Sequence, residues 1–274
     1  MKAYINPNSP HFFAFNIWDI ASAKSIMDAA QIKQKPIILQ TSMKAFSLMD
    51  LEAMRFFVTT YAKKKAIPVY LHLDHCKKIE MIQEAIAAGW DSVMIDASDK
   101  LLDENIELTN YVTELAHGKN VLVESEVGQV SGVEDDITVS GTGVARVEDI
   151  QKFLKNTNVD MLAVAIGTAH GQYTGIPDLH YDLLQQTGEM TKIPLVIHGG
   201  TGLSDDTLRR LFSYQSVKKI NISTDVKQAY RLGIERCYKE QEIKEKGFDP
   251  LKVTGRIHDS ICKMAMEKLS LLEG

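Results

Sequence analysis

An aspartate and a histidine stand side by side where a predicted buried strand ends. Residues 69–73 are rich in β-branched and aliphatic side chains, and Pro68 precedes them, which favours a strand in the interior of a sheet. Asp74 and His75 follow directly. A hydrophobic core has no use for a carboxylate beside an imidazole. A site at a strand end does, because the rigid strand fixes the direction of both groups. We therefore expect Asp74 and His75 to belong to an active site.

Two further histidines follow apolar runs in the same way. His170 comes shortly after residues 160–166, and His198 comes directly after residues 194–197. Three histidines suffice for a catalytic zinc ion, which takes three protein ligands and keeps a further position open. Each histidine alone could instead be a hydrogen-bonded loop residue, and their spacing gives no local ligand motif. The prediction that His75, His170 and His198 bind one Zn²⁺ therefore depends on a fold that brings them together.

Two short segments near the end of the chain are typical of phosphate binding. Gly199-Gly200-Thr201-Gly202 and Asn221-Ile-Ser-Thr224 each follow an apolar run and precede a predicted helix. Backbone N–H groups of such a turn, together with a helix N-terminus, bind anions. A tight turn is the structural alternative, because glycine also serves turns. Their position after the last two strands favours a phosphate site.

The elements that must position these residues alternate regularly. Eight apolar runs are predicted as strands, at residues 12–16, 36–40, 68–73, 91–95, 120–125, 160–166, 194–197 and 218–222. Helical periodicity separates and follows them, at residues 20–32, 48–65, 77–88, 101–117, 147–155, 179–187 and 204–213, in a long helix from residue 224, and in an extra terminal helix at 251–272. Strictly alternating units of this kind form a parallel sheet, and eight of them close most economically into an α/β (β/α)8 barrel.

An open doubly wound sheet is the alternative architecture, but no Gly-x-Gly-x-x-Gly motif follows the first strand. No linker is visible, so we predict a single (β/α)8 barrel domain over residues 1–274 with an extra C-terminal helix. In a barrel, the carboxyl ends of all strands share the face that carries the active site. The polar residues that follow the strands should meet on that face: Asn16, Ser42, Asp74, His75, Asp96, Glu126, His170, His198 and Asn221.

Composition and charge limit the class of protein. Of the 274 residues, 45% are hydrophobic and 24% charged, as in ordinary globular proteins. The net charge of −5 gives no basic surface for nucleic acid or for an anionic membrane. The three cysteines match no disulfide framework or zinc ribbon, which favours a reducing compartment. No apolar run is long enough for a membrane span, so we expect a soluble, cytoplasmic protein without nucleic-acid or membrane partners.

The motifs together resemble those of the class II, zinc-dependent ketose-bisphosphate aldolases, a family that includes fructose- and tagatose-bisphosphate aldolases. The resemblance runs from about residue 15 to residue 225, in the family's order. It rests on HLDHC at 72–76, SVMIDAS at 92–98, VESEVGQVSGVEDD at 123–136, AIGTAHGQYTG at 165–175, PLVIHGGTG at 194–202 and KINIST at 219–224.

This resemblance implies roles for individual residues. His75, His170 and His198 would ligate zinc. Asp74 would be the acid/base that handles the proton of the substrate's C4 hydroxyl. Glu134 would exchange the proton at the nucleophilic carbon of dihydroxyacetone phosphate. A zinc ion on the carbonyl and hydroxyl oxygens of that fragment would stabilise the enediolate left by cleavage, so no Schiff-base lysine is needed.

The resemblance also assigns residues around the centre. Asp96 and Glu126 would serve a second metal position, and residues 128–143 are long and flexible enough for a lid that brings Glu134 in. His72 alternates with apolar neighbours and should point into the barrel as a core histidine. Asn16 and Ser42 would line the substrate pocket. The dihydroxyacetone phosphate end, often with a monovalent cation (Na⁺ or K⁺), would be held by Gly171, Gly199, Gly200, Thr201, Asn221, Ser223 and Thr224.

The expected reaction is reversible cleavage of a ketose 1,6-bisphosphate in carbohydrate metabolism such as glycolysis, with fructose 1,6-bisphosphate favoured. Tagatose 1,6-bisphosphate and 6-phospho-5-dehydro-2-deoxygluconate are alternatives, and Ser223 decides between none of them. Fructose-specific relatives use an arginine of a neighbouring subunit for the distal phosphate, and His258 stands there in this chain. A homo-oligomer, dimer or tetramer, is expected. A zinc-dependent barrel hydrolase would fit the histidines but neither the glycine segment nor Glu134, and a non-catalytic binding scaffold is the third possibility.

Overall fold

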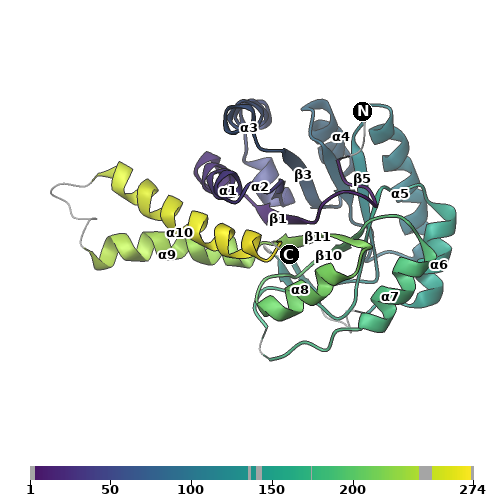
Figure 1. Ribbon diagram of the computed structural model, residues 1–274. Coiled ribbons are helices and arrows are strands. Elements are labelled where there is room, and N and C mark those ends of the chain that lie inside the picture. Colours follow the sequence, from purple (N-terminus) through teal and green to yellow (C-terminus); the bar gives the residue numbers. More distant parts are fainter. Residues whose placement is uncertain (1–3, 135–136, 140–143, 174, 241–248, 273–274) are drawn as a thin grey trace.

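The computed structural model describes residues 4–134, 137–139, 144–173, 175–240 and 249–272, with the backbone alone for 133, 134 and 137–139. Eight parallel strands close into a barrel in the order β1-β11-β10-β8-β5-β4-β3-β2 (Figure 1). The fold prediction is therefore confirmed. The barrel strands are β1 Phe12–Asn16, β2 Ile37–Thr41, β3 Val69–Cys76, β4 Ser92–Ile95, β5 Leu122–Val127, β8 Met161–Val164, β10 Leu195–Ile197 and β11 Val217–Ile222.

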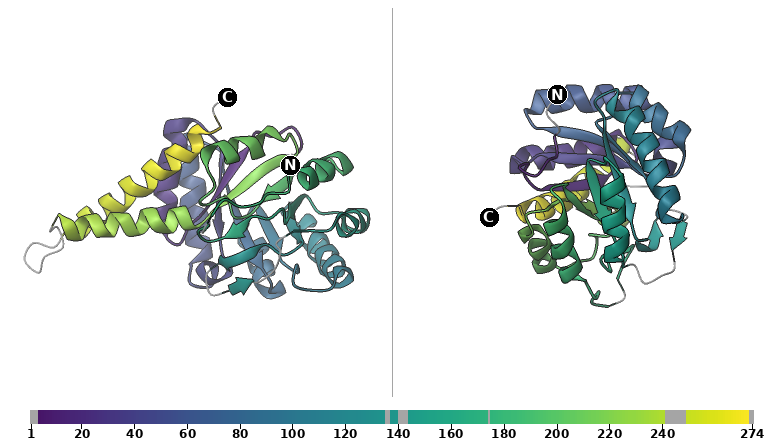
Figure 2. Two further views of the ribbon diagram at one scale, coloured as in Figure 1. Left: turned by 90° about the horizontal axis from the view of Figure 1, so that it is seen from below. Right: turned by 90° about the vertical axis from the view of Figure 1, so that its right-hand side faces the viewer.

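Helices between the strands cover the outside of the barrel, as Figure 2 shows from two further sides. Each presents an apolar stripe to the strands, because a helix beside a sheet must bury one face. These helices are α1 Ile20–Lys33, α3 Leu51–Lys65, α4 Ile79–Ala87, α5 Leu102–His117, α6 Val147–Asn156, α7 Tyr181–Met190 and α8 Asp205–Ser213, and α9 Thr224–Lys239 follows the last strand. Among the described residues, no helix is both long and apolar enough to span a membrane.

Two predicted segments differ in detail from the structure. The predicted helix over residues 48–65 is present as α3 but begins three residues later, at Leu51, because Asp50 caps its N-terminus. A short helix that was not predicted, α2 (Met43–Ser47), precedes it and is capped by Ser42. Residues 128–143, predicted as a long and flexible lid segment, contain the antiparallel strands β6 (Ser131–Glu134) and β7 (Ile137–Val139). β6 also pairs with β9 (Ala169–His170), so this hairpin joins the backbone of His170.

The interior of the barrel changes character along its axis. Its amino-terminal end is filled by a small apolar cluster of Ile5, Phe12, Ala14, Ile38, Met161, Ala163 and Val196. Closer to the carboxyl ends of β3, β5 and β11, the strands carry His72, Glu124 and Lys219, respectively. These three side chains are completely buried. Because inward-facing side chains recur every second residue of a strand, this polar layer lies directly below the strand ends.

Helix α9 and the terminal helix α10 (Pro250–Ser270) lie side by side and extend beyond the barrel (Figure 1). α10 also packs against α1, so we propose that the chain forms one domain from its first helix to its last. Asp28 of α1 ties these elements together, because it accepts hydrogen bonds from Lys24, Tyr61, Lys65 and His258. His258, which the resemblance places at the position of the arginine for the distal phosphate, thus bonds within its own chain.

Replacing Gly233 by alanine should destabilise the pair of helices α9 and α10. A Cβ at Gly233 would lie 2.6 Å from Ile257 Cα, so the two helices would have to move apart. Overpacking of this kind costs about 1–3 kcal/mol of unfolding free energy. Gly255→Ala on α10 is the matched control, because among the described residues no atom outside its own helix backbone lies within 4 Å of its added Cβ. There alanine should raise stability by up to about 1 kcal/mol. Urea unfolding measures both, and equal effects would contradict the proposed close packing.

Candidate metal centre and active site

Three imidazoles that are far apart in the sequence meet at the carboxyl end of the barrel. His75 belongs to β3, His170 to β9, and His198 follows β10. His75 Nε2 and His198 Nδ1 lie 2.6 Å apart, and one ring nitrogen of each of the three histidines lies within 4.8 Å of the others. The structure therefore brings together the residues predicted as zinc ligands.

A distortion of β3 directs Asp74 and His75 toward the same site. In a regular strand these neighbours would point to opposite faces of the barrel wall. The pairing of β3 with β4 shifts register between Leu73 and Cys76, and His75 has a left-handed backbone with φ of 46°. Such a conformation is strained for a residue other than glycine and is typical of functional sites. The predicted strand ended at residue 73, whereas β3 continues for three more residues, through Cys76.

Each of His75 and His198 directs one ring nitrogen toward the other two histidines. The second ring nitrogen of each bonds to a carboxylate. His75 Nδ1 donates to Asp96 Oδ2 at 3.0 Å, and Asp96 Oδ1 accepts from Ser98. His198 Nε2 donates to Glu124 Oε1 at 2.8 Å. An imidazole that donates one N–H to a carboxylate presents the lone pair of its other nitrogen, as metal-binding histidines do.

The three converging imidazoles of His75, His170 and His198 fit a zinc ion. Burial lowers the pKa of His170 well below its usual value, and His75 and His198 lower it further, which favours the neutral imidazole that a metal requires. Glu126 Oε2 is buried without a hydrogen-bond partner in the described part of the chain, 3.6 Å from His198 Nδ1. Burial, followed by the charge of Asp96, raises the pKa of Glu126 to about 7. Asp96 and Glu126 thus border the histidines, where a second metal position was predicted.

Asp74 lies beside the histidines and is almost fully buried. Its Oδ2 accepts from Gln40 Nε2 at 2.8 Å and its Oδ1 accepts from Asn221 Nδ2 at 3.2 Å. Burial alone would raise the pKa of this carboxyl, but interactions with His75, His72 and Lys219 outweigh burial and lower the pKa well below its usual value. Asp74 is therefore an ionised, oriented carboxylate that can accept a proton from a substrate hydroxyl.

Of the other residues predicted for the substrate pocket, Asn16 lies near this carboxylate, whereas Ser42 caps a helix. Asn16 is buried, and its Oδ1 accepts from Gln40, the same amide that holds Asp74. Ser42 Oγ accepts from the backbone N–H of Ala45 at 3.5 Å and caps α2. The backbone of Glu134 lies in β6, and its side chain is outside the described part of the structure.

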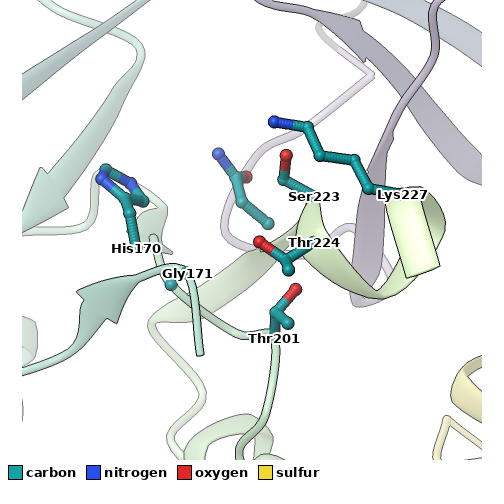
Figure 3. Close-up of a pocket in the computed structure, with 8 residues that line it drawn as sticks. His170, Gly171, Thr201, Ser223, Thr224 and Lys227 are labelled. Carbon is teal, nitrogen blue, oxygen red and sulfur yellow. The ribbon is translucent and has the colours of Figure 1, made fainter. Parts of the chain in front are cut away.

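A pocket next to His170 contains most of the residues predicted to hold a phosphate (Figure 3). It lies at the start of α9, where helix N–H groups attract anions. Its lining consists of His170, Gly171, Gly199, Thr201, Asn221, Ser223, Thr224 and Lys227. Gly200 lies behind this lining, because its N–H donates to the carbonyl of Asn221 and an added Cβ would contact Ile220 at 2.5 Å.

The turn after β10 requires glycine at this pocket. Gly199 has φ of 71°, and a Cβ there would lie 2.4 Å from the carbonyl oxygen of Ala169. Tyr173 fastens the same two segments, since its hydroxyl donates to Gly199 O at 2.7 Å and accepts from Ala169 N at 2.9 Å. The loops after β8 and β10 are thus held together beside this pocket.

Sequence reasoning missed four residues of the site. Gln40, Glu124 and Lys219 stand inside runs that were assigned to strand interiors, and Lys227 stands one turn into α9. A charged residue at an inward position of a buried strand was the available signal for Glu124 and Lys219, because such residues are almost never fully buried unless paired. For Lys227, the signal was a cation within a helical turn of Asn221-Ile-Ser-Thr224.

Comparisons with known proteins agree with this arrangement. The sequence profile of the family described as "Fructose-bisphosphate aldolase class-II" matches residues 5–274. A fructose-bisphosphate aldolase of Geobacillus stearothermophilus is 34% identical over 264 residues, which cover 93% of this chain and 88% of that protein. A 6-phospho-5-dehydro-2-deoxy-D-gluconate aldolase of Bacillus subtilis is 38% identical over 229 residues, which cover 82% of this chain and 78% of that protein. The crystal structure of the YdjI aldolase from Escherichia coli K12 superposes with a TM-score of 0.76 at 26% identity, covering 96% of this chain and 91% of that one.

Proposed function

The chain belongs to the class II fructose-bisphosphate aldolase family and is therefore a lyase, and from this premise we propose that it reversibly cleaves a ketose 1,6-bisphosphate to dihydroxyacetone phosphate and an aldehyde phosphate. One observation carries the proposal. Three convergent imidazoles, a buried aspartate and a pocket at the start of α9 lie together at the same end of the barrel. Aldol cleavage of a phosphorylated ketose needs these three parts together.

In this proposal His75, His170 and His198 hold Zn²⁺, and Asp96 and Glu126 serve a second position for it. When bound, zinc would supply Lewis acidity toward the substrate's carbonyl oxygen. Neutral imidazole ligands would cancel none of the positive charge that this chemistry uses. Asp96 and Glu124 keep two of the rings in their orientation through hydrogen bonds.

Asp74 is the proposed acid/base. Its carboxylate removes the proton of the C4 hydroxyl as the C3–C4 bond breaks, and returns that proton in the condensation direction. Gln40 and Asn221 each donate to one of its oxygens, which fixes the direction in which the carboxylate points. Glu134, carried on the hairpin that pairs with β9, is proposed to exchange the proton at the nucleophilic carbon of dihydroxyacetone phosphate, with residues 128–143 as a lid.

The pocket beside His170 is the proposed site of the ketone-side phosphate. Asn221 Oδ1 and Ser223 Oγ are buried oxygens that have no hydrogen-bond partner within the described ranges. They suit a substrate hydroxyl or a monovalent cation, Na⁺ or K⁺, which we include in the proposal. Lys227 adds a charge of the sign that a phosphate requires.

Among ketose phosphates, fructose 1,6-bisphosphate is the favoured substrate. The relatives named above act, by their names, on fructose bisphosphate in one case and on 6-phospho-5-dehydro-2-deoxy-D-gluconate in the other. Tagatose 1,6-bisphosphate and the gluconate derivative are therefore the alternatives, within carbohydrate metabolism. A homo-oligomer, dimer or tetramer, is supported by exposed Leu232, Tyr238 and Leu251 on α9 and α10. Three buried cysteines, none of them in a disulfide bond, support a reducing, cytoplasmic location.

Release of dihydroxyacetone phosphate tests the proposed function. The zinc-loaded protein is incubated separately with fructose 1,6-bisphosphate, tagatose 1,6-bisphosphate and 6-phospho-5-dehydro-2-deoxygluconate, and the triose phosphate is followed by coupled reduction. We expect release from at least one substrate, with the highest kcat/KM for the fructose compound. If none of the three releases dihydroxyacetone phosphate, the proposed reaction is wrong.

Replacing Lys227 by methionine should weaken binding of the ketone-side phosphate. A hydrogen bond to a charged group contributes about 1.5–3 kcal/mol, so KM and the inhibition constant of inorganic phosphate should rise by roughly 10- to 100-fold. The chemistry at the histidines is left intact, so kcat should change little. Steady-state kinetics with phosphate as a competitive inhibitor measure both constants.

Arg231→Met is the matched control for that experiment. It removes a cation one turn further along α9, where Arg231 pairs with Glu235 and its side chain is 74% exposed. We expect its KM to equal that of the unmodified protein. Equal loss of phosphate inhibition in both variants, or no loss in Lys227→Met, would remove Lys227 from the phosphate site.

A further inference from the structure

A buried ion pair crosses the barrel just below the histidines. Glu124 of β5 and Lys219 of β11 are completely buried, and Lys219 Nζ lies 2.7 Å from Glu124 Oε2. The two strands are not neighbours in the barrel, so the pair spans its interior. Desolvation of two charges offsets their attraction, and well-packed apolar side chains are often as stable in such a position. Stability therefore does not explain why this pair is charged.

The second oxygen of the same carboxylate reaches one of the imidazoles. Glu124 Oε1 accepts from His198 Nε2 at 2.8 Å, while Oε2 accepts from Lys219. With its proton on Nε2, His198 presents the lone pair of Nδ1, the atom that lies 2.6 Å from His75 Nε2. Lys219 thus holds Glu124, and Glu124 holds the ring of His198 in one tautomer and one orientation.

The neighbouring residue His72 does not hold the ring of His198. His72 lies below Asp74, with its Nδ1 bonded to Ser92 and its Nε2 3.5 Å from Glu124. His72, Asp74 and Glu124 have the spacing of a metal site, but the ammonium of Lys219 already supplies the positive charge beside Glu124. The cluster is better explained as support for the histidine above it than as a separate site.

We propose that Lys219 and Glu124 act as positioning residues for His198, and that their hydrogen bonds set the zinc affinity of the histidine centre. The inference rests on the proposed metal site formed by His75, His170 and His198. It goes beyond that proposal because neither Lys219 nor Glu124 is one of the three convergent histidines or lines the pocket beside His170. A carboxylate behind a metal-bound histidine typically raises metal affinity by about 10- to 100-fold.

Glu124→Asp and the double variant Glu124→Gln/Lys219→Met test the proposal. The first keeps both charges but is one methylene too short to reach His198 and Lys219 together. The second removes both charges with side chains of similar size, so that the barrel does not retain an unpaired buried ion. Zinc affinity is measured by competition with a chromophoric chelator, and folding of the metal-free protein by thermal unfolding. We expect both variants to fold and to bind Zn²⁺ about 10- to 100-fold more weakly. The visible spectrum of bound Co²⁺ should also change, because it reports the orientation of the ligands.

Ser92→Ala is the control for general damage to the barrel interior. Ser92 bonds to His72 and Tyr4 in the same buried layer but makes no hydrogen bond to Glu124. It should lower the unfolding temperature without changing zinc affinity. The proposal is overturned if either Glu124 variant keeps wild-type affinity, or if Ser92→Ala loses as much. His75→Ala separates the two levels of inference. Unchanged zinc binding in that variant would refute the metal site itself, whereas loss there with normal affinity in Glu124→Asp would refute only the positioning role.

Discussion

Replacing Asp74 by alanine is expected to reduce kcat by about 10² or more while zinc stays bound. Asp74 is buried, and its pKa lies well below the usual value, so it is a proton acceptor at neutral pH. Its two oxygens are oriented by Gln40 and Asn221, and it is not among the three convergent imidazoles. Removal should therefore affect proton transfer and spare the metal. Steady-state kinetics together with metal analysis of the purified variant measure the two effects separately.

Asp99→Ala is a suitable comparison for Asp74→Ala. Asp99 is an exposed aspartate shortly after the carboxyl end of β4, and it pairs with Lys77. Its removal should leave both kcat and zinc content unchanged. Full activity in Asp74→Ala would exclude this residue from the mechanism, and loss of zinc from that variant would make Asp74 a ligand instead of an acid/base.

Removal of the metal should have the largest effect on turnover. Chelation of the native protein, or the substitution His198→Ala, should lower kcat/KM by about 10³-fold or more. Lewis-acid stabilisation contributes several kcal/mol, and each 1.36 kcal/mol corresponds to a factor of ten in rate. Added Zn²⁺ should restore the chelated native protein but not His198→Ala, because the variant lacks one of the three imidazoles.

His117→Ala provides the comparison for the histidine substitution. His117 ends α5 and bonds to Asp160, well outside the histidine centre. It should bind zinc and cleave substrate as the unmodified chain does. Undiminished cleavage by the chelated native protein, with its zinc shown to be gone, would contradict a metal-dependent reaction.

The barrel and the position of its site were predictable from the sequence for a physical reason. In a closed parallel barrel, both sides of each strand are buried, so strands appear as short apolar runs. The first polar residues after each run must then lie on one face. Asp74, His75 and His198 were found in this way, and His170 came from the loop after the sixth predicted strand.

Other parts of the site could not be read from that pattern. Gln40, Glu124 and Lys219 lie within runs that are apolar on average, and only their pairing across the barrel explains how they are buried. The distortion that turns His75 toward the site occurs without a glycine, so no sequence signal marks it. The hairpin of β6 and β7 was missed because its strands hold only short stretches of alternating residues, and it is anchored by pairing with β9.

Anomalous diffraction at the zinc absorption edge tests the central claim most directly. Crystals of the zinc-loaded protein should show one peak bound by three imidazole nitrogens, from His75, His170 and His198, at about 2.0–2.1 Å each. A zinc ion bound away from both these histidines and the proposed second position at Asp96 and Glu126 would contradict the account, as would an ion bound by only one of the histidines.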